Sequence, residues 1–389
     1  MKNAFDIAVV GAGVFGSWCA YQLRQAGAKV ALIDAYGPAN SRASSGGESR
    51  ILRLGYGPDE IYTRSAQRSF GLWTAIFQRI SPDQNISTQE LFRQTGVLWL
   101  AHAEDTYCEA TVANLGKVGA RYERLNRDEL TLRYPQLSYQ SVDWGVLEVE
   151  AGVLMARRAV QAISALAQSD GVTYFQELVL PPQTSKELQS VSLGSGQNIS
   201  AGKFIFACGP WLPKVFPRLL ADLFHVTKQE VFFFGVPAGD TRFEPTQLPA
   251  WIDFHDLLYG LPDLDHRGFK LAIDAHGPRF DPDTGERVAS AEGLETTRRY
   301  LAQRVPALAN APLLETRVCQ YENTSNGDFL IDVHPEISNV WLVGGGSGHG
   351  FKHGPAVGEY LVQMISGGGV SEPRYALATK QKIQERKVY

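Results

Sequence analysis

The stretch FDIAVVGAGVFG, residues 5–16, decides the fold predicted for this chain. Its first six residues form a short apolar run that is typical of a buried strand in a parallel sheet. Three glycines follow in the spacing G-x-G-x-x-G. Residues 17–27 then have a helical pattern that ends at Gly27, and residues 28–34 predict a second strand that closes with Asp34. The sequence therefore predicts a complete strand–turn–helix–strand unit.

Each conspicuous residue of this unit has a physical role in binding a dinucleotide. Gly11 permits the tight turn, Gly13 lets a pyrophosphate approach the backbone, and Gly16 lets the helix pack closely on the sheet. The helix N-terminus favours phosphate charge, and Asp34 can accept a hydrogen bond from a ribose hydroxyl. A glycine-rich turn with a purely structural role is the alternative. Because we find only one such fingerprint, the unit binds either NAD(P) or FAD, and other motifs must decide.

The loop after the second strand, residues 37–56, is rich in small residues and arginine. Ser44 and Ser45, with the two glycines that follow, offer hydroxyl and backbone donors. Arg50 and Arg53 are three positions apart and share one face if the segment ESRILRLGY forms a helix. Such a segment suits anionic groups, such as cofactor phosphates, a flavin or a substrate carboxylate. A solvated basic helix end is the alternative.

The middle of the chain predicts further elements of an α/β frame and a second domain. Residues 150–171 predict a helix, and the segment 203–211 predicts a parallel strand that ends at Gly209, close to a cofactor. Residues 85–149 and 220–318 contain aromatic and alternating stretches that indicate a mostly antiparallel sheet. We interpret them as one substrate domain. The remaining segments form a discontinuous Rossmann-type domain made of residues 1–84, 150–219 and 319–389.

A second glycine-rich loop lies near the C-terminus, in NVWLVGGGSGHGFKHGPAVGEYLVQMI, residues 339–365. An apolar strand leads into the glycines, and a helix follows. A helix dipole at this point would stabilise negative charge, as on a reduced flavin. Enzymes that use NAD have no general need for such a loop, so this segment favours FAD. A second structural turn is the alternative.

The composition is that of an ordinary globular protein. The chain has 389 residues, 44% of them hydrophobic and 20% charged, with a formal net charge of -4. This balance argues against a general binder of nucleic acid or anionic membranes, and no run of about 18 apolar residues predicts a membrane span. The four cysteines are scattered without a C-x-x-C pair, so neither a metal site nor a disulfide framework is predicted. We expect a cytoplasmic protein without a signal peptide.

Five motifs together resemble the monomeric sarcosine oxidase family of flavin amine oxidases, within the D-amino acid oxidase superfamily. They are GAGVFG…LID, ASSGGESRILRLGY, LLYGLPDLDHRGFKLAID, RVCQYENTSNGDFLIDVHP and GGGSGHGFKHGPAVG. The family includes oxidases of N-methyl amino acids, pipecolate and fructosyl amino acids. The resemblance covers essentially the whole chain in the right order. It implies FAD as the cofactor, in a Rossmann-type domain with an inserted, mostly antiparallel substrate domain.

The resemblance also implies roles for individual residues. Cys319 matches the cysteine that forms a thioether with the flavin 8α-methyl group, and Arg50 matches an arginine at the flavin. Lys270 matches the lysine that activates oxygen, for which a fixed cation is the physical reason. His349 matches a histidine in the glycine-rich flavin loop, so that Lys270, Arg50 and His349 are the candidate catalytic residues.

Further candidates line the substrate and cofactor sites. Arg53 and Lys352 match the pair that binds the substrate carboxylate, and Tyr259 and Tyr321 match tyrosines of the substrate cavity. The candidate cofactor-binding residues, besides Arg50 and Cys319, are Gly11, Gly13, Val14, Phe15, Gly16, Asp34, Ser44, Ser45, Gly346, Gly348, Gly350, Phe351 and Lys352.

Two positions depart from the family pattern. Gly46 stands where the family often has a histidine, which removes a polar group near the flavin and is expected to open space. Asp274 stands four residues after Lys270, where the sarcosine-type enzymes have another histidine. An acid in the substrate cavity weakens the preference for a simple anionic amino acid and favours an additional cationic or hydroxylated group.

The resemblance implies an FAD-dependent oxidase of a secondary amine or N-substituted amino acid. A hydride equivalent passes from the substrate carbon to the flavin, water hydrolyses the resulting imine, and dioxygen yields hydrogen peroxide. The expected partners are a small amine and O2, and a monomer is expected. The alternatives are a flavin amine dehydrogenase with another acceptor, a 2-hydroxy acid oxidase, and a flavin-binding subunit of a larger complex.

Overall fold

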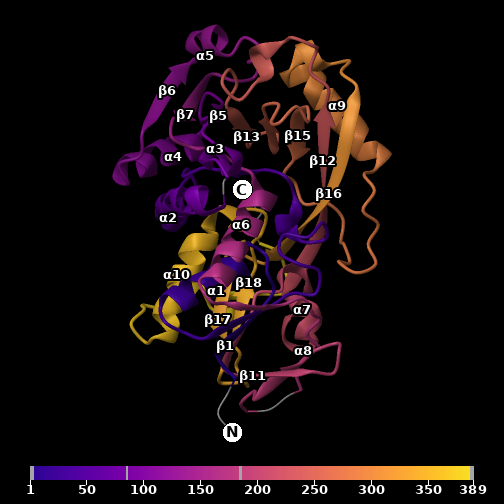
Figure 1. The fold of residues 1–389 in the computed structure, drawn as a ribbon. Helices are drawn as coiled ribbons and strands as arrows, with labels where there is room; N and C mark the ends of the chain where they lie inside the picture. The colour runs from indigo at the N-terminus through magenta and orange to yellow at the C-terminus, as the bar shows by residue number, and fades with distance from the viewer. Residues whose placement is uncertain (1–3, 85, 184–185, 386–389) are drawn as a thin grey trace.

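The computed structural model describes residues 4–84, 86–183 and 186–385. Two large sheets lie one above the other along the long direction of the molecule (Figure 1). The lower sheet contains β1 and β11, and the upper one contains β5, β12 and β16. The predicted combination of a Rossmann-type sheet with a mostly antiparallel sheet is therefore confirmed. Within the described residues, none of the helices combines the length and apolarity needed to cross a membrane.

The lower sheet has the strand order β17-β18-β11-β1-β2-β9, with β10 paired to β11. β1 pairs in parallel with both β2 and β11, and β18 pairs in parallel with β11. Parallel strands bring their carboxyl ends to one edge, where ligands bind in open α/β sheets. The strands are β1 (Phe5–Val10), β2 (Val30–Ile33), β9 (Thr173–Phe175), β10 (Ser190–Ser192), β11 (Asn198–Phe206), β17 (Leu330–Val333) and β18 (Val340–Gly344).

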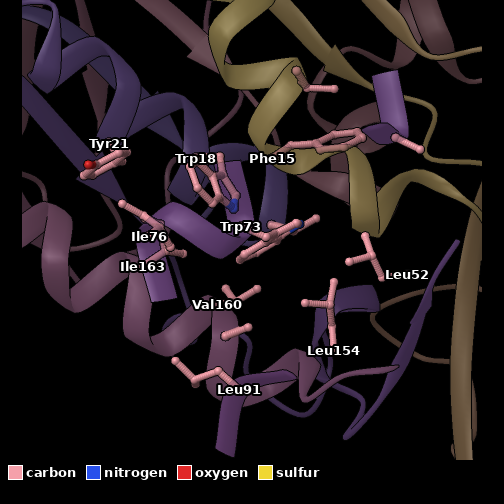
Figure 2. Packing of buried hydrophobic residues seen from close by; sticks show 14 of the residues in the cluster. Phe15, Trp18, Tyr21, Leu52, Trp73, Ile76, Leu91, Leu154, Val160 and Ile163 are labelled. Atoms are coloured by element: carbon pink, nitrogen blue, oxygen red, sulfur yellow. The ribbon is translucent and has the colours of Figure 1, made fainter. Parts of the chain in front are cut away.

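Helices from distant parts of the chain share one core beside this sheet. α1 packs against α10 and α6, and α10 packs against α2. Figure 2 shows Trp18 and Trp73 at the centre, near Val160 and Ile163. The two indole rings meet edge to face, with centroids 4.9 Å apart, a favoured aromatic geometry. The helices are α1 (Val14–Gln25), α2 (Glu60–Gln84), α6 (Ala156–Ser169) and α10 (Gly354–Ile365).

The upper sheet has the order β16-β12-β15-β14-β13-β5-β7-β6. Its pairs are antiparallel except β5 with β13, so the predicted antiparallel character holds with one exception. Helix α9 packs against β15 and β12 at one side of this sheet (Figure 1). The strands are β5 (Val97–Ala101), β6 (Tyr122–Asn126), β7 (Trp144–Glu148), β12 (Phe224–Phe234), β13 (Ala250–Asp253), β14 (Leu258–Leu261), β15 (Phe269–Ile273) and β16 (Leu313–Thr324). The division of the chain into domains at the predicted boundaries stays a prediction.

Shorter elements complete the described chain. A small sheet has the order β3-β8-β4, formed by β3 (Arg50–Leu52), β8 (Gly152–Leu154) and β4 (Phe92–Arg93). The remaining α-helices are α3 (Thr88–Leu91), α4 (Thr106–Lys117), α5 (Arg127–Arg133), α7 (Leu212–Val215), α8 (Pro217–Leu220) and α9 (Ala291–Arg304). Short 3-10 helices include η1 (Ser44–Gly46), η2 (Gly209–Trp211) and η5 (Gly350–His353).

Three local predictions need correction. The segment ESRILRLGY contains strand β3 and no helix, so Arg50 and Arg53 do not share a helical face. The helix predicted over 150–171 begins only at Ala156, because β8 before it pairs with β3 and β4. The strand predicted to end at Gly209 ends at Phe206, and Gly209 begins η2. In the first two cases, backbone pairing with a distant strand overrides the local sequence pattern.

The close approach of α1 to the first turn generates a stability prediction. A Cβ atom at Gly16 would lie 1.8 Å from the carbonyl oxygen of Gly11, so Gly16→Ala forces the helix away from the sheet. We expect a loss of about 1–3 kcal/mol in the free energy of unfolding, measured by denaturant titration. Gly71→Ala on α2 is the control, since nothing lies within 4 Å of its Cβ position, and it should stabilise the protein by roughly 0.5–1 kcal/mol. Equal stability of the two variants would contradict the packing argument.

Candidate active site

The main cavity, with a volume of about 380 Å³, lies at the carboxyl ends of β1, β2 and β11. Most predicted cofactor-binding residues line it. They are Gly11, Gly13, Val14, Phe15, Asp34, Ser44, Ser45, Arg50, Cys319, Gly346, Gly348, Gly350 and Phe351. Gly16 is not among its lining residues, and Lys352 lines a second cavity instead. The structure therefore brings two glycine-rich loops, one near each end of the sequence, to the same cavity wall.

The first glycine turn is fixed by backbone geometry and by Asp34. Gly11 has φ +103, and a Cβ atom there would lie 2.3 Å from Ala207 O, so only glycine fits. Asp34 Oδ2 accepts the Ala12 N–H at 2.7 Å, and its Oδ1 accepts two further backbone N–H groups. Burial raises the pKa of Asp34, and these hydrogen bonds oppose that rise. Asp34 therefore organises the turn in addition to lining the cavity.

Arg50 and Cys319 meet at the wall of this cavity. Arg50 Nη2 lies 3.2 Å from Cys319 Sγ and donates a hydrogen bond to Ser44 O at 2.7 Å. Although burial disfavours the guanidinium charge, the pKa of Arg50 is raised by Cys319 and by two nearby tyrosines. A thiolate beside a fixed guanidinium is the reactive form of cysteine. The predicted pair is thus brought together by strands that are 269 positions apart.

Cys208 also lines the cofactor cavity, but its surroundings differ. Its Sγ faces Val10 O at 3.6 Å. Burial, followed by the charges of Asp34 and Glu322, raises its pKa far above the usual thiol range. A cysteine in this environment stays protonated and unreactive. The cavity thus contains one cysteine beside a cation and another beside acids.

Lys270 reaches the site from β15 and is 4% exposed. Its Nζ donates to Ser49 O at 3.2 Å and to Ser49 Oγ at 3.1 Å. Burial first, and then the positive charge of Arg50, lower the pKa of Lys270 to about 7. The ammonium is therefore poised to change its charge near neutral pH.

The second cavity, of about 80 Å³, adjoins the first. The residues that line both are Arg50, Cys319, Tyr321, Gly348 and Phe351. The predicted substrate and catalytic residues also line it, namely Arg53, Tyr259, Lys270, Asp274, His349 and Lys352. The structure thus assembles all of these residues around one small space. They come from β3 and the residue after it, from β14, from β15 and the residue after it, from β16, and from the C-terminal glycine-rich loop.

Arg53 is held in an aromatic cage at one side of the second cavity. Its guanidinium lies 4.2 Å from the ring centre of Tyr56, 4.8 Å from Trp99 and 5.5 Å from Phe254. It also donates to the carbonyl oxygen of Gly55. Cation–π contacts become stronger when water is excluded, so the cage stabilises the buried guanidinium and fixes its position.

Lys352 begins a hydrogen-bonded chain that leads out of the cavity. Its Nζ donates to Tyr56 OH at 2.8 Å, and that hydroxyl lies 2.7 Å from His353 Nε2. The other ring nitrogen of His353 lies 2.9 Å from Ser65 Oγ. Burial and the charge of Arg53 lower the pKa of Lys352 well below its usual range. An anionic ligand between the two cations would oppose that shift.

His349 lines the second cavity, and both of its ring nitrogens lie within hydrogen-bond distance of other protein groups. Its Nε2 lies 2.9 Å from Gly327 O, and its Nδ1 lies 3.3 Å from Tyr56 OH. The ring stacks on Phe329 with centroids 5.0 Å apart. These contacts hold the glycine-rich loop in place, which is a positioning role for the residue predicted as catalytic.

Asp274 and Tyr321 form a pair inside the second cavity. Tyr321 OH donates to Asp274 Oδ1 at 2.7 Å. Removal from solvent raises the pKa of Asp274 to about 6, while the tyrosine, Arg53 and Lys352 lower it. Tyr259 lies on the other side, with its ring centre 5.7 Å from Lys270 Nζ. The cavity therefore presents the carboxyl group of Asp274 to a ligand as well as the basic groups of Arg53 and Lys352.

The expectation that Gly46 opens space near the flavin is wrong. A Cβ atom at this position would lie 2.0 Å from Asn40 O, so the neighbouring backbone already fills the space. Arg157 also donates twice to the carbonyl oxygen of Gly46, at 2.9 and 2.6 Å. The backbone at Asn40 therefore occupies the space that a side chain at position 46 would need. This packing could not be inferred from the sequence of the loop.

The sequence analysis missed several residues of the site. Glu322 lines the cofactor cavity, and Ser49 contacts Lys270. Tyr56 and His353 lie behind Lys352. The sequence signal for Glu322 was its position next to Tyr321 in a strand, but only the fold shows that its side chain faces the cavity wall.

The comparisons with known proteins agree with this geometry. The fold and the paired cavities define an enzyme of the dinucleotide-binding class. The family model for FAD dependent oxidoreductases matches residues 6–364, and the chain belongs to this family. Within the family, the chain is 30% identical over 381 residues to a monomeric sarcosine oxidase of Bacillus sp. (strain B-0618), covering 94% of this chain and 93% of that protein. It is 27% identical to the human peroxisomal sarcosine oxidase, covering 93% and 92% of the two chains.

Solved structures share the fold. The L-proline dehydrogenase of P. horikoshii has a TM-score of 0.81 at 22% identity, covering 97% of this chain and 98% of that one. NikD, described as an unusual amino acid oxidase essential for nikkomycin biosynthesis, has a TM-score of 0.77 at 21% identity, covering 96% and 98%. The predicted resemblance to sarcosine oxidase-like flavoenzymes is thus confirmed.

The residues of the main cavity fit FAD. First-turn N–H groups of α1 have no partner within the helix and face a cavity that can hold phosphates. The Val14 N–H donates a hydrogen bond to Ser45 Oγ at 3.0 Å. This bond connects the loop that contains Ser45 to the first glycine turn. Arg50 supplies positive charge at the junction with the second cavity, and Glu322 Oε2 is a buried oxygen without a hydrogen-bond partner among the described residues. A bound dinucleotide would supply interaction partners for these N–H groups, for Arg50 and for Glu322 Oε2.

Proposed function

We propose that the protein is an FAD-dependent oxidase of a small secondary amine or N-substituted amino acid, with O2 as electron acceptor. The second cavity is the observation that carries the proposal, because it adjoins the cofactor cavity and holds Arg53, Lys352 and Lys270. Sarcosine oxidases among its relatives support the same chemistry. Bound FAD supplies a two-electron acceptor for the substrate C–H bond. The balanced reaction converts the amine, O2 and water into a primary amine, a carbonyl compound and hydrogen peroxide.

The basic residues and the tyrosines of the second cavity have different roles. Arg53 and Lys352 bind the substrate carboxylate, and the ligand's negative charge relieves the repulsion between the two cations. Tyr259 and Tyr321 form apolar walls that exclude water from the reacting carbon. Because the residues hold the substrate in one orientation beside the cofactor cavity, positioning supplies much of their contribution.

The size and charge of the second cavity narrow the substrate class. About 80 Å³ is far less than the roughly 300–1,000 Å³ of drug-sized pockets. This favours a small N-methyl or cyclic amino acid over a glycated one. Asp274 is an acid at this site, so a substrate with an additional hydroxyl or cationic group is favoured over sarcosine. The protein acts as a monomer in this proposal.

A peroxide assay tests the proposed function directly. N-methyl, cyclic, hydroxylated and glycated amino acids are offered to the holoenzyme, together with 2-hydroxy acids and amines that lack the carboxylate. We expect peroxide from small secondary amino acids, and at least about 100-fold lower kcat/KM for the amines without a carboxylate, since two buried cations then lose their partner. Flavin reduction by 2-hydroxy acids and by none of the amines would overturn the proposal.

Lys270 should control the reaction with oxygen. A fixed ammonium stabilises the negative charge that develops on O2, so Lys270→Met should slow flavin reoxidation by about 100-fold or more. The protonated fraction of Lys270 falls as pH rises through about 7. The wild-type reoxidation rate constant should therefore fall between pH 6 and pH 9, and the variant should lose this dependence. Stopped-flow reoxidation in aerated buffer measures both quantities.

The control for this experiment is Lys382→Met, which removes a surface lysine that pairs with Asp222 at 2.6 Å. It should reoxidise like the wild type at every pH. Slow wild-type reoxidation that does not respond to Lys270→Met would indicate a dehydrogenase with another electron acceptor.

Cys319 is proposed as the covalent attachment point of the flavin. Its position 3.2 Å from Arg50 Nη2 supports this assignment. After acid precipitation, the yellow colour should pellet with wild-type protein and remain in the supernatant with Cys319→Ala. The matched control is Cys208→Ala, which removes the other cysteine of the cavity and should leave the colour in the pellet. Colour in the wild-type supernatant would show that no covalent bond forms.

A further inference from the structure

Glu322 is a buried acid in the wall of the cofactor cavity. It follows Tyr321 on β16, is 7% exposed, and lines the main cavity. Its carboxyl group lies between the loops that follow β11 and β18. A Cβ atom built on Gly209 would lie 3.9 Å from Glu322 Oε2, and one built on Gly346 would lie 3.6 Å from Oε1. The acid is therefore next to two segments that themselves line the cofactor cavity.

The hydrogen bonds of this carboxyl group are incomplete. Oε1 accepts the Gly346 N–H at 3.3 Å. Oε2 is buried and has no hydrogen-bond partner among the described residues, and no Lys or Arg of that part of the chain forms an ion pair with it. Burial raises the pKa of Glu322 to about 8, although the backbone N–H groups of Gly346 and Gly345 oppose this rise. The carboxyl group is therefore mostly protonated at neutral pH. A buried hydroxyl donor without an acceptor is costly.

We propose that Glu322 is a cofactor-binding residue whose carboxylic acid donates a hydrogen bond to an acceptor oxygen of bound FAD. The dinucleotide carries carbonyl, hydroxyl and phosphate oxygens, and it occupies the cavity that Glu322 lines. Binding thus gives the O–H of Glu322 the acceptor that the protein does not supply. The inference rests on FAD binding, and it is independent of the amine substrate and of the bond to Cys319.

The proposal makes FAD affinity depend on pH. In the protein without cofactor, Glu322 ionises as pH rises through about 8. The ionised form has no proton to donate and repels acceptor oxygens, so FAD binding must weaken above that pH. Cys208, on the turn after β11, is a titratable group close to Glu322, and burial raises the pKa of this thiol far above that range. β18 and its loop contribute backbone groups at this point.

The experiment measures FAD affinity in a Cys319→Ala background, in which the cofactor can be removed and added back. Apoprotein is titrated with FAD from pH 6.5 to pH 9.5, and binding is followed by flavin fluorescence. The parent should show a break near pH 8, with the dissociation constant rising at higher pH. Glu322→Gln keeps a neutral donor and should bind FAD without the break. Glu322→Leu should bind about two- to tenfold more weakly than the parent at pH 6.5, as expected for one lost hydrogen bond.

Glu177→Gln is the matched control, because Glu177 lines the same cavity. This variant should keep the break near pH 8. If Glu322→Gln keeps the break as well, or if the parent has none, the proposal is overturned. The test remains decisive even if Glu322→Leu fails to fold, because it compares only the parent with Glu322→Gln. Loss of amine oxidation without a change in these titrations would count against the proposed function and leave the role of Glu322 intact.

Discussion

The alternation of side chains along β16 is the constraint on which the candidate site depends. β16 pairs with β12 over most of its length, which places Cys319 opposite Gln229 and Tyr321 opposite Thr227. A shift of this pairing by one residue would exchange Cys319 for Gln320 and Tyr321 for Glu322. The long pairing with β12, in a sheet whose other face is packed, fixes the register against such a shift. One strand thereby sets the positions of the cysteine beside Arg50, the tyrosine beside Asp274 and the buried acid.

A concentration of buried positive charge is the second general feature. Lys270, Lys352 and Arg53 lie around a small cavity, each at most 5% exposed. Burial, and after it repulsion by a neighbouring arginine, lowers the pKa of both lysines. The protein offsets this cost with the aromatic cage around Arg53 and with the carboxylate of Asp274. Such a site favours anionic ligands and developing negative charge, because the positive groups are already held in place.

The agreement between sequence and structure is best where a motif is local. The turn at Gly11, the helix after it and the strand that ends at Asp34 depend on residues within one segment, and they form as predicted. The agreement fails where distant backbone decides the conformation. β8 replaces the start of a predicted helix because β3 and β4 pair with it, and Gly46 leaves no space because Asn40 O fills it. Neither contact has a signal in the local residue pattern.

The sequence by itself determined the dinucleotide fold, the second glycine-rich loop and the residue types that resemble flavin amine oxidases. These follow from short-range spacing, in which turn geometry and helix capping limit the choice of residue. Only the tertiary structure decided which polar groups meet. Cys319 lies beside Arg50, Cys208 lies near acids, and Glu322 Oε2 has no hydrogen-bond partner among the described residues. None of these surroundings could be inferred from the local sequence. The physical reason is that burial and neighbouring charge set the chemistry of a side chain, and both arise from contacts between distant segments.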